Sequence, residues 1–312
     1  MLKDLSRPVR VLSGIIVLLL IQTAASIQAQ NLTLEGQTGG FITPTAYVVR
    51  ARTGSFFSRP SIGYHYVHAG DVIGDVHTAS FTEGFANWAE VGYTRNAHTN
   101  GNNPYFSALW EYPGMNIFHG KGIMLKENSF GSPWTPGVAA GFVVRTGDHF
   151  VTGAIDGKSY TNEDVYVSVT KTALNLKLPI LANVGFKMTN ASIYGIGGQS
   201  TRFGGRFFGG IGFPLPGPWH TAIIPAAGFT QEPYHVQNLG LFIPGGGQIP
   251  TTLDYAVRIT QREDARFSID VGVGQVAGQI GYTVLPSPGG PVVAPVNLEA
   301  RSVFGIGASF QF

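Results

Sequence analysis

The sequence predicts an all-β protein, a single closed antiparallel transmembrane β-barrel of roughly 12–14 strands. The first observation behind this prediction is composition: 43 of the 312 residues are glycine and 12% are charged, whereas about 25% of the residues in typical soluble domains are charged. Because each glycine weakens a helix interior by about 1 kcal/mol, this composition favours short strands joined by turns. The other two observations are an alternating C-terminal run and a series of similar runs upstream of it.

The closing strand is expected at residues 302–312, where apolar residues alternate with small or polar ones without a break. The apolar face holds Phe304, Ile306, Ala308, Phe310 and Phe312, and the opposite face holds Val303, Gly305, Gly307, Ser309 and Gln311. Successive strand side chains point to opposite faces, and a tilted transmembrane strand needs about 9–11 residues. We therefore expect the apolar face to contact lipid and the other face to line the lumen.

Residues 1–29 are predicted to be a secretory signal peptide that is cleaved after Ser26 or after Ala29. Three cations precede an apolar run over residues 11–21, and this run is too short for a membrane-spanning helix. Without residues 1–29, the 17 basic and 17 acidic side chains balance, so a basic surface for nucleic acid is not indicated. The chain has no cysteine, which excludes disulfides and thiolate metal sites. An exported barrel is expected in the cell outer membrane.

Residues 30–59 do not alternate, and they form a separate N-terminal motif segment in front of the barrel. Three glycines in the centre of this segment permit unusual φ angles, and Pro44 lacks the N–H that a strand ladder needs. We expect this segment to pack at the mouth of the barrel or inside its lumen, and the barrel itself to span residues 60–312.

The barrel region is a series of strand-length alternating runs. The clearest runs cover residues 62–67, 89–96, 138–145, 165–170, 182–189, 253–260 and 267–273, and less regular candidates cover 106–110 and 117–125. After residue 274 the apolar residues move from odd to even positions. A one-residue shift exchanges the two faces of a strand, so we predict a turn near Gly274-Gln275 and a long loop over residues 285–301.

The expected topology follows from placing the C-terminus in the periplasm. Loop 285–301 is then extracellular, and the turn near Gly274 is periplasmic. We also expect the polar stretch 146–163 to be an extracellular loop and residues 128–136 to lie at the periplasmic end. In or beside this polar stretch, Asp148, Asp156, Glu163 and Asp164 are expected to be solvated loop carboxylates, because EF-hand spacing is absent.

Several polar residues lie on strand faces opposite apolar ones, and we expect them to face the lumen. They are His65, Glu90, Asn183, Lys187, Asp254, Arg258, Asp270 and Gln279. A lysine or arginine that faces lipid near the midplane costs about 2–4 kcal/mol, which favours the inward orientation. Their mixed signs allow two arrangements, ion pairs that plug a narrow lumen or a lining for a hydrophilic path.

Other candidate sites are weaker. Residues 272–277 match the dinucleotide fingerprint G-x-G-x-x-A, but strand-like alternation on both sides replaces the helix that the motif needs, so no cofactor is expected. His65 and His68 are three apart and face opposite sides of a strand, and although His65 and His77 could meet across a hairpin, no metal site is expected. No G-x-S-x-G occurs, and no catalytic residues are assigned.

The stretch Gly36-Gln37-Thr38-Gly39-Gly40-Phe41-Ile42-Thr43-Pro44-Thr45-Ala46-Tyr47 resembles the start of the YjbH-like family of exopolysaccharide-associated outer-membrane proteins. That family carries Gly-x-x-Gly-x-Ile-x-x-Pro-Thr-Ala early in the mature chain; here the glycine stretch is one residue longer and Pro44 follows Ile42 one residue sooner. The resemblance implies an outer-membrane location and envelope polysaccharide as a partner. In addition, Phe310 and Phe312 resemble the C-terminal signal that the barrel assembly machinery reads.

The function expected from the sequence is that of a non-enzymatic outer-membrane barrel, in contact with outer-membrane lipid, with a role in envelope polysaccharide export or solute passage. The alternative is an outer-membrane barrel enzyme that acts on lipid or polysaccharide. A soluble exported β-sandwich is a third hypothesis.

Overall fold

The computed structural model describes most of the chain outside the predicted signal. The described residues are 31–51, 54–99, 101–103, 114–147, 160–191, 193–196, 199–233, 251–261, 266–285 and 287–312. The predicted signal peptide and the candidate strand at residues 106–110 lie outside them.

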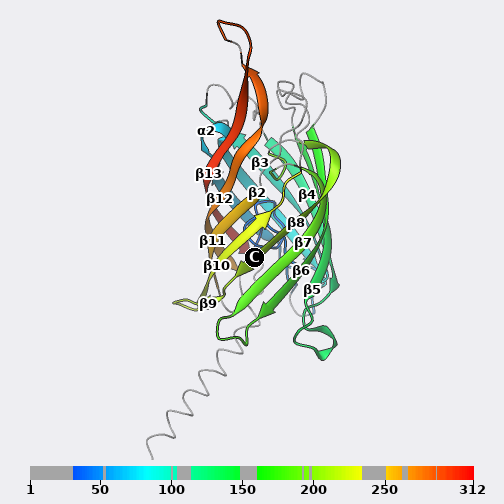
Figure 1. The fold of residues 1–312 in the computed structure, drawn as a ribbon. Helices are drawn as coiled ribbons and strands as arrows, with labels where there is room; N and C mark the ends of the chain where they lie inside the picture. Colours follow the sequence, from blue (N-terminus) through cyan, green and yellow to red (C-terminus); the bar gives the residue numbers. More distant parts are fainter. Residues whose placement is uncertain are drawn as a thin grey trace, which may run out of the picture.

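The described chain is almost entirely β-structure (Figure 1). The strands are β1 (Ser61–His68), β2 (Asp75–Phe85), β3 (Ala89–Thr99), β4 (Gly114–Leu125), β5 (Gly137–Gly147), β6 (Tyr160–Ala173), β7 (Ile180–Ala191), β8 (Gln199–Gly212), β9 (Leu215–Pro216), β10 (Thr221–Thr230), β11 (Thr252–Gln261), β12 (Phe267–Leu285) and β13 (Val292–Gln311). One short α-helix, α2 (Gly70–Ile73), and one 3₁₀ turn, η3 (Ser129–Gly131), lie in connections.

The strands close into one antiparallel barrel. Strands β1 to β8 pair in sequence order, and so do strands β10 to β13. β8 pairs with β10, and β9 adds two residues beside β10. The first and last strands complete the ring, with Ser61 opposite Gln311 and His68 opposite Phe304. Apart from β9, twelve strands make the wall, so the predicted fold class is confirmed.

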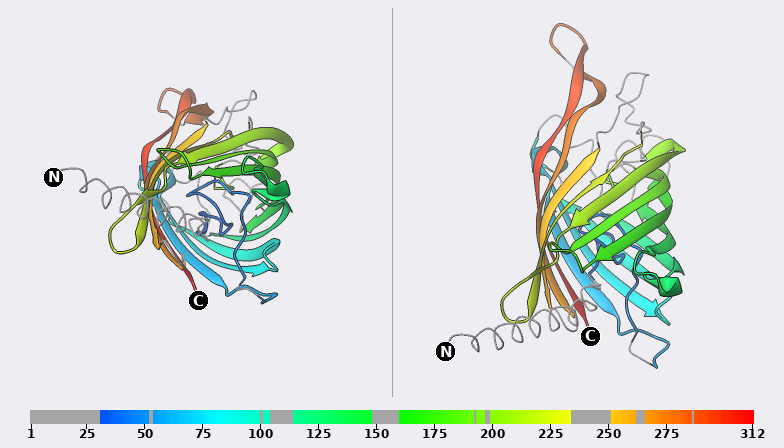
Figure 2. Two further views of the ribbon diagram at one scale, coloured as in Figure 1. Left: turned by 90° about the horizontal axis from the view of Figure 1, so that it is seen from below. Right: turned by 60° about the horizontal axis from the view of Figure 1, so that its bottom comes forward.

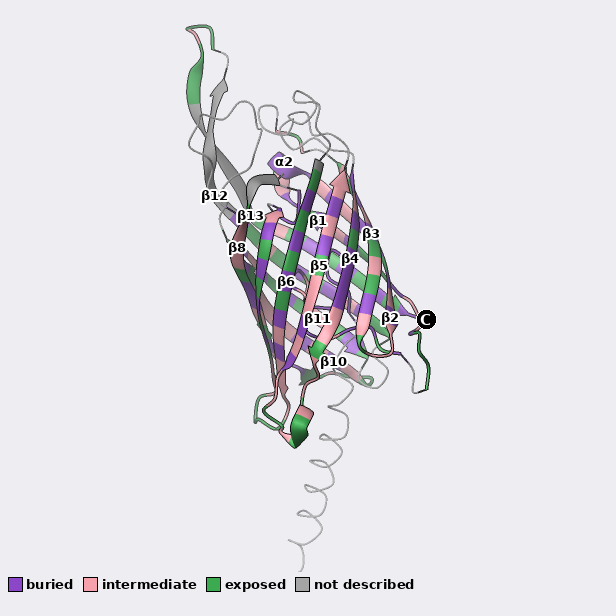
Figure 3. Ribbon diagram, turned by 90° about the vertical axis from the view of Figure 1, so that its right-hand side faces the viewer, coloured by how far each residue is buried: buried purple, intermediate pink, exposed green. Residues whose placement is uncertain are grey.

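Buried and exposed positions alternate along the strands, as Figure 3 shows for β6. In β13, Phe304, Ile306, Phe310 and Phe312 are exposed on the outside while the intervening residues 305–311 at odd positions are buried. The alternation predicted for the closing strand is therefore observed. Large exposed side chains elsewhere on the outer face are also apolar, among them Phe81, Phe142, Phe186, Val257 and Val271. Such a surface suits lipid rather than water.

In the part of the chain that the structure describes, no helix has both the length and the apolar character needed to cross a membrane.

The apolar outer face makes a depth-dependent prediction. Val167 is 42% exposed near the centre of β6, and Glu163 is exposed on the same face toward one end. Val167→Arg is expected to lower the free energy of unfolding by about 2–4 kcal/mol, whereas Glu163→Arg is expected to cost about 0–1 kcal/mol. Equilibrium urea unfolding in lipid vesicles measures both. Equal losses at the two depths would contradict a lipid-embedded belt.

The structure corrects the predicted turn near Gly274-Gln275 and the predicted loop over residues 285–301. β12 continues through Gly274 to Leu285, and its register against β13 shifts between Gly274 and Val276 and again between Gln279 and Gly281. An extra residue in one strand moves the apolar phase to the other face without reversing the chain. The chain instead turns at residues 287–290, where the Gly290 N–H donates to the Ser287 carbonyl at 2.9 Å, and β13 starts at Val292.

The two ends of the barrel differ. The β12–β13 hairpin projects beyond the other strands (Figure 1), and we call this side the hairpin end. The opposite side, which holds Phe312 and the η3 connection, is the C-terminal end. β5 ends and β6 begins at the hairpin end.

Asp164 belongs to β6 and is buried, so its assignment to a solvated loop was wrong. The sequence pattern missed this because β6 starts inside a polar run.

Candidate functional site: a plug segment in the lumen

Residues 31–51, which we call the plug segment, lie inside the barrel, where the view along the axis in Figure 2 shows them within the ring of strands. Most of them are buried, including Leu32, Gln37 and Val49. The segment folds on itself, because the Thr33 N–H donates to the Gln37 carbonyl at 2.7 Å and the Gly39 N–H donates to the Asn31 carbonyl at 2.9 Å. The lumen is therefore occupied by an ordered stretch of backbone.

A close approach between this backbone and the wall depends on Gly36. Its φ is +88°, and a Cβ atom there would lie 2.4 Å from Oγ1 of Thr94 on β3. Thr94 Oγ1 donates to the Glu35 carbonyl at 2.8 Å, and Thr82 Oγ1 donates to the Gly36 carbonyl at 2.6 Å. Glycine is thus required for both its conformation and its lack of a side chain.

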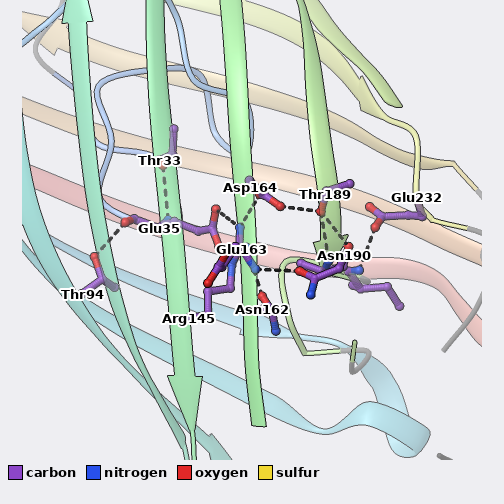
Figure 4. Close-up of polar contacts among 12 residues, drawn as sticks. Thr33, Glu35, Thr94, Arg145, Asn162, Glu163, Asp164, Thr189, Asn190 and Glu232 are labelled. Atoms are coloured by element: carbon purple, nitrogen blue, oxygen red, sulfur yellow. Dashed lines mark hydrogen bonds and ion pairs between the residues drawn. The ribbon is translucent and has the colours of Figure 1, made fainter. Parts of the chain in front are cut away.

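The strongest charged contact joins the plug segment to β5 and β6, and we call it the Arg145 clamp (Figure 4). Arg145 donates to both carboxylate oxygens of Glu35, with Nη2 to Oε2 at 2.9 Å, and also to Asp164 Oδ2 at 2.7 Å. Its Nη1 donates to Asn162 Oδ1 at 3.1 Å, and Thr189 Oγ1 donates to Asp164. The Arg145 side chain is fully buried, so its charge is neutralised only by this network.

A second contact, the Glu90–Lys121 clamp, grips the plug backbone. Glu90 on β3 and Lys121 on β4 are opposite each other in register and lie 3.1 Å apart, both fully buried. Glu90 accepts hydrogen bonds from the N–H groups of Thr38 and Val49, each at 2.9 Å. Lys121 Nζ donates to the carbonyls of Thr38 at 2.7 Å and Thr45 at 3.0 Å. A wall ion pair thereby satisfies several backbone groups of the plug segment.

A third contact, on β11 and β12, again joins an ion pair of the wall to the backbone of the plug segment. Arg258 on β11 pairs with the directly opposite Asp270 on β12, with Nε to Oδ1 at 2.6 Å and Nη2 to Oδ2 at 2.8 Å. The remaining Arg258 Nη1 donates to the Gly39 carbonyl at 2.7 Å. On β7, Asn183 Nδ2 donates to the Pro44 carbonyl at 3.0 Å.

Near the C-terminal end, Tyr47 fixes the last part of the plug segment. Its hydroxyl donates to Glu127 Oε2 at 2.7 Å and lies 2.6 Å from Thr172 Oγ1. Burial, together with the nearby Glu127 carboxylate, raises the pKa of the Tyr47 phenol above its ordinary value.

A second inward element, residues 193–196 between β7 and β8, occupies the lumen toward the hairpin end. The N–H of Ile193 donates to Glu232 Oε2 at 2.8 Å, and Thr252 Oγ1 donates to Glu232 Oε1 at 3.1 Å. Burial raises the pKa of the Glu232 carboxyl above its ordinary value.

The residues predicted to face the lumen occupy the following places. Glu90, Asn183, Arg258 and Asp270 belong to the plug contacts described above. His65 is fully buried with its ring 5.9 Å from that of Phe41, Lys187 Nζ lies 5.4 Å from the centre of the Tyr194 ring, and Asp254 is buried. The side chain of Gln279 lies outside the described residues. His77 is on the outer side, bonded to Tyr64.

Sequence reasoning missed Lys121, Arg145 and Asp164. Lys121 was hidden because Met115 and Ile117, which face the same way on β4, are apolar and buried. Arg145 stood on the correct face but next to a predicted loop, and nothing in the sequence linked it to Glu35. Across the described residues, no three His, Asp or Glu side chains are grouped to hold a metal ion.

Space remains between the plug segment and the wall of β7, β8, β10, β11 and β12. This cavity of about 80 Å³ is bordered by Gly39, Thr43 and Asn183 and by the Arg258–Asp270 pair. It is large enough for several water molecules, but it is much narrower than the barrel.

Comparison with known proteins finds no matching family model and no matching curated protein. Among solved structures, the chain is similar to the KdgM porin, at 11% identity and a TM-score of 0.45, covering 81% of this chain and 99% of that one. It is also similar to the NanC porin, at 9% identity and a TM-score of 0.43, covering 81% and 100%, and to Omp33 of Acinetobacter baumannii, at 11% identity and a TM-score of 0.38, covering 82% and 99%. At these TM-scores the likeness carries no inference about what passes through this barrel.

Proposed function

We propose that this chain is a non-enzymatic outer-membrane barrel that is closed at rest by the plug segment and admits a solute when that segment moves. The observation that carries the proposal is the occupation of the lumen by residues 31–51, held by charged side chains of the wall. The apolar outer face and the closed ring of strands support the membrane location, because both satisfy the requirements of a lipid environment. In this setting Phe310 and Phe312 serve as the assembly signal.

The charge arrangement supports a plug that can leave. Glu90 pairs with Lys121 and Arg258 pairs with Asp270 within the wall itself, and Arg145 keeps Asp164 when Glu35 departs. Removing the plug segment therefore leaves Lys121, Arg145 and Arg258 each with a wall carboxylate. The plug contributes mainly backbone groups, which water can replace. Along the walls that carry these pairs, a vacated lumen would be polar, as a hydrophilic path requires.

The substrate class that we propose rests on the resemblance of residues 36–47 to the YjbH-like family. The resembling residues 36–47 form the part of the plug segment that the wall grips. We propose envelope polysaccharide as the solute, since its hydroxyl groups can replace the backbone donors and acceptors at Glu90, Lys121 and Arg258. The hairpin end is then extracellular, and the plug segment joins β1 at the periplasmic end.

Conductance in planar bilayers tests the closed state. The wild-type barrel is expected to stay closed, and a variant lacking residues 31–50 is expected to conduct steadily. Oligosaccharides added to the deleted variant should reduce its current if they enter the lumen. A deleted barrel that folds, as judged by heat-modifiable gel mobility, and still does not conduct would overturn the proposal.

If the plug segment moves, an engineered disulfide can lock it in place, because the chain has no cysteine of its own that would form a competing disulfide. Ideal Cβ positions place Gly137 on β5 3.5 Å from the Cβ of Ala46, within reach of a disulfide. Oxidised Ala46→Cys/Gly137→Cys is expected to suppress openings induced by low urea, and reduction is expected to restore them. The matched control is Gly212→Cys/Ala226→Cys, which has the same 3.5 Å separation but joins two wall strands. Equal behaviour of the two variants would contradict plug movement.

A further inference from the structure

One part of the lumen toward the hairpin end is apolar, although the interior of a membrane barrel is ordinarily polar. A cavity of about 70 Å³ lies there, within a wider region of about 650 Å³ that includes open solvent, and we call it the apolar chamber. Its lining includes Leu34, Ile73, Ile196 and Val276, together with Asp254.

The chamber is built from six parts of the chain: the plug segment, residues 67–76 around α2, the inward element 193–196, and residues 252–254 of β11, 274–276 of β12 and 303–305 of β13. Their apolar side chains would make an ordinary core if they filled the space between them. They pack into one apolar cluster but leave about 70 Å³ between them, with the apolar character of small-molecule pockets.

Asp254 is the single acidic side chain in the lining. It is only 6% exposed, and its Oδ1 receives no hydrogen bond from the described residues. The other polar side chains of the lining are used, because the Tyr194 hydroxyl bonds Thr230 and the Thr252 hydroxyl bonds Glu232. The adjacent Arg258 is held by Asp270 and Gly39. A buried carboxylate oxygen without a donor is costly, and a ligand with a donor would relieve that cost.

The described wall is lowest beside this chamber. β10 ends at Thr230 and β11 starts at Thr252, while the neighbouring β12 continues to Leu285. Only residues 208–212 of β8 pair with β10, although β8 starts at Gln199. Thr252 and Leu253 at this rim line the chamber. An apolar molecule at the outer face of the barrel is therefore close to it.

We propose that the apolar chamber binds an amphiphile with an apolar body and one hydrogen-bond-donating head, of the alkyl-amine or alkyl-alcohol class. The body packs against Leu34, Ile73 and Ile196, and the head donates to Asp254. Sugar polymers do not suit this lining, so the site goes beyond the proposed passage of solutes. Because Leu34, Phe41 and Ile42 belong to the plug segment, the site belongs to the barrel with the plug segment in place.

Photolabelling of the full barrel in proteoliposomes tests the site. The probes are a ten-carbon amine, a ten-carbon alcohol and a ten-carbon alkane, each with a diazirine in its chain, and labelled peptides are mapped by mass spectrometry. The amine and the alcohol are expected to label residues 34–42, 193–196 and 252–254, and excess decylamine is expected to remove this labelling. Oligosaccharide is expected to leave it unchanged. Labelling confined to outward-facing residues would overturn the proposal.

Three variants test the position of the site and its contact with the head group. Val276→Trp fills the chamber and is expected to abolish labelling there, while Val273→Trp, on the lipid side of the same strand, is expected to preserve it. Asp254→Asn is expected to weaken chamber labelling by the amine by about tenfold and to spare the alcohol. If the alkane labels the chamber as well as the amine does, and Asp254→Asn changes neither, the assigned head-group contact is wrong. If Val276→Trp fails to fold, competition by decylamine for labelling of the wild-type chamber still tests whether the chamber binds the amine.

Discussion

Arg145→Met is expected to lower the free energy of unfolding by about 3–5 kcal/mol, as is usual when one partner of a buried ion pair is removed. Methionine keeps much of the apolar stem but leaves Glu35 and Asp164 facing each other without the cation between them. One carboxylate belongs to the plug segment and the other to the wall, so their repulsion acts across the plug contact. The same variant is therefore expected to show spontaneous conductance in planar bilayers.

Urea unfolding in vesicles and single-channel recording measure the two effects of Arg145→Met separately. The matched control is Arg95→Met, an arginine of β3 whose Nη1 donates to Asn116 and which is away from the plug segment. It is expected to change stability by no more than about 0.5 kcal/mol. Adding Glu35→Gln to Arg145→Met is expected to recover part of the stability, because only one buried carboxylate then lacks a cation. Equal losses of stability in Arg145→Met and Arg95→Met would contradict the claim that the buried charge of Arg145 holds the plug segment.

The sequence was sufficient to predict the barrel because the evidence is local. Alternation along residues 302–312 depends only on which side chains meet lipid, and the structure exposes Phe304 and Ile306 as that pattern requires. The same local rule failed at Gly274, where a bulge and a turn produce the same change of phase. Distinguishing them needs the partner strand, since β13 continues beside β12 on both sides of the shift.

The candidate site was predicted less completely, for a different reason. Glu90 and Asp270 could be assigned to the inner face one strand at a time, but their partners come from other strands and from the plug segment. Lys121 lies opposite Glu90 only because β3 and β4 pair in one particular register. Glu35 has no periodic neighbours at all, so its contact with Arg145, 110 residues away in sequence, follows from the tertiary structure alone.

The Glu90–Lys121 clamp gives the second large effect. Glu90→Gln is expected to cost about 3–5 kcal/mol, because Lys121 is left buried without a carboxylate. Lys121→Met is expected to fall at the lower end of that range, since Glu90 still accepts hydrogen bonds from Thr38 and Val49. The double variant Glu90→Gln/Lys121→Met is expected to lose less than the sum of the two, and a double-mutant cycle by urea unfolding measures the coupling.

The Lys171–Glu127 pair provides the comparison, because Lys171 is 22% exposed and lies 3.0 Å from Glu127 at the C-terminal end. Lys171→Met is expected to cost about 0–1 kcal/mol, as for other solvent-accessible pairs. A strong coupling at Glu90–Lys121 beside a weak effect at Lys171 would show that burial sets the strength of the clamp. Coupling near zero would mean instead that packing of the plug segment, rather than its charged contacts, holds the lumen closed, and conductance would then respond to plug deletion but not to Glu90→Gln.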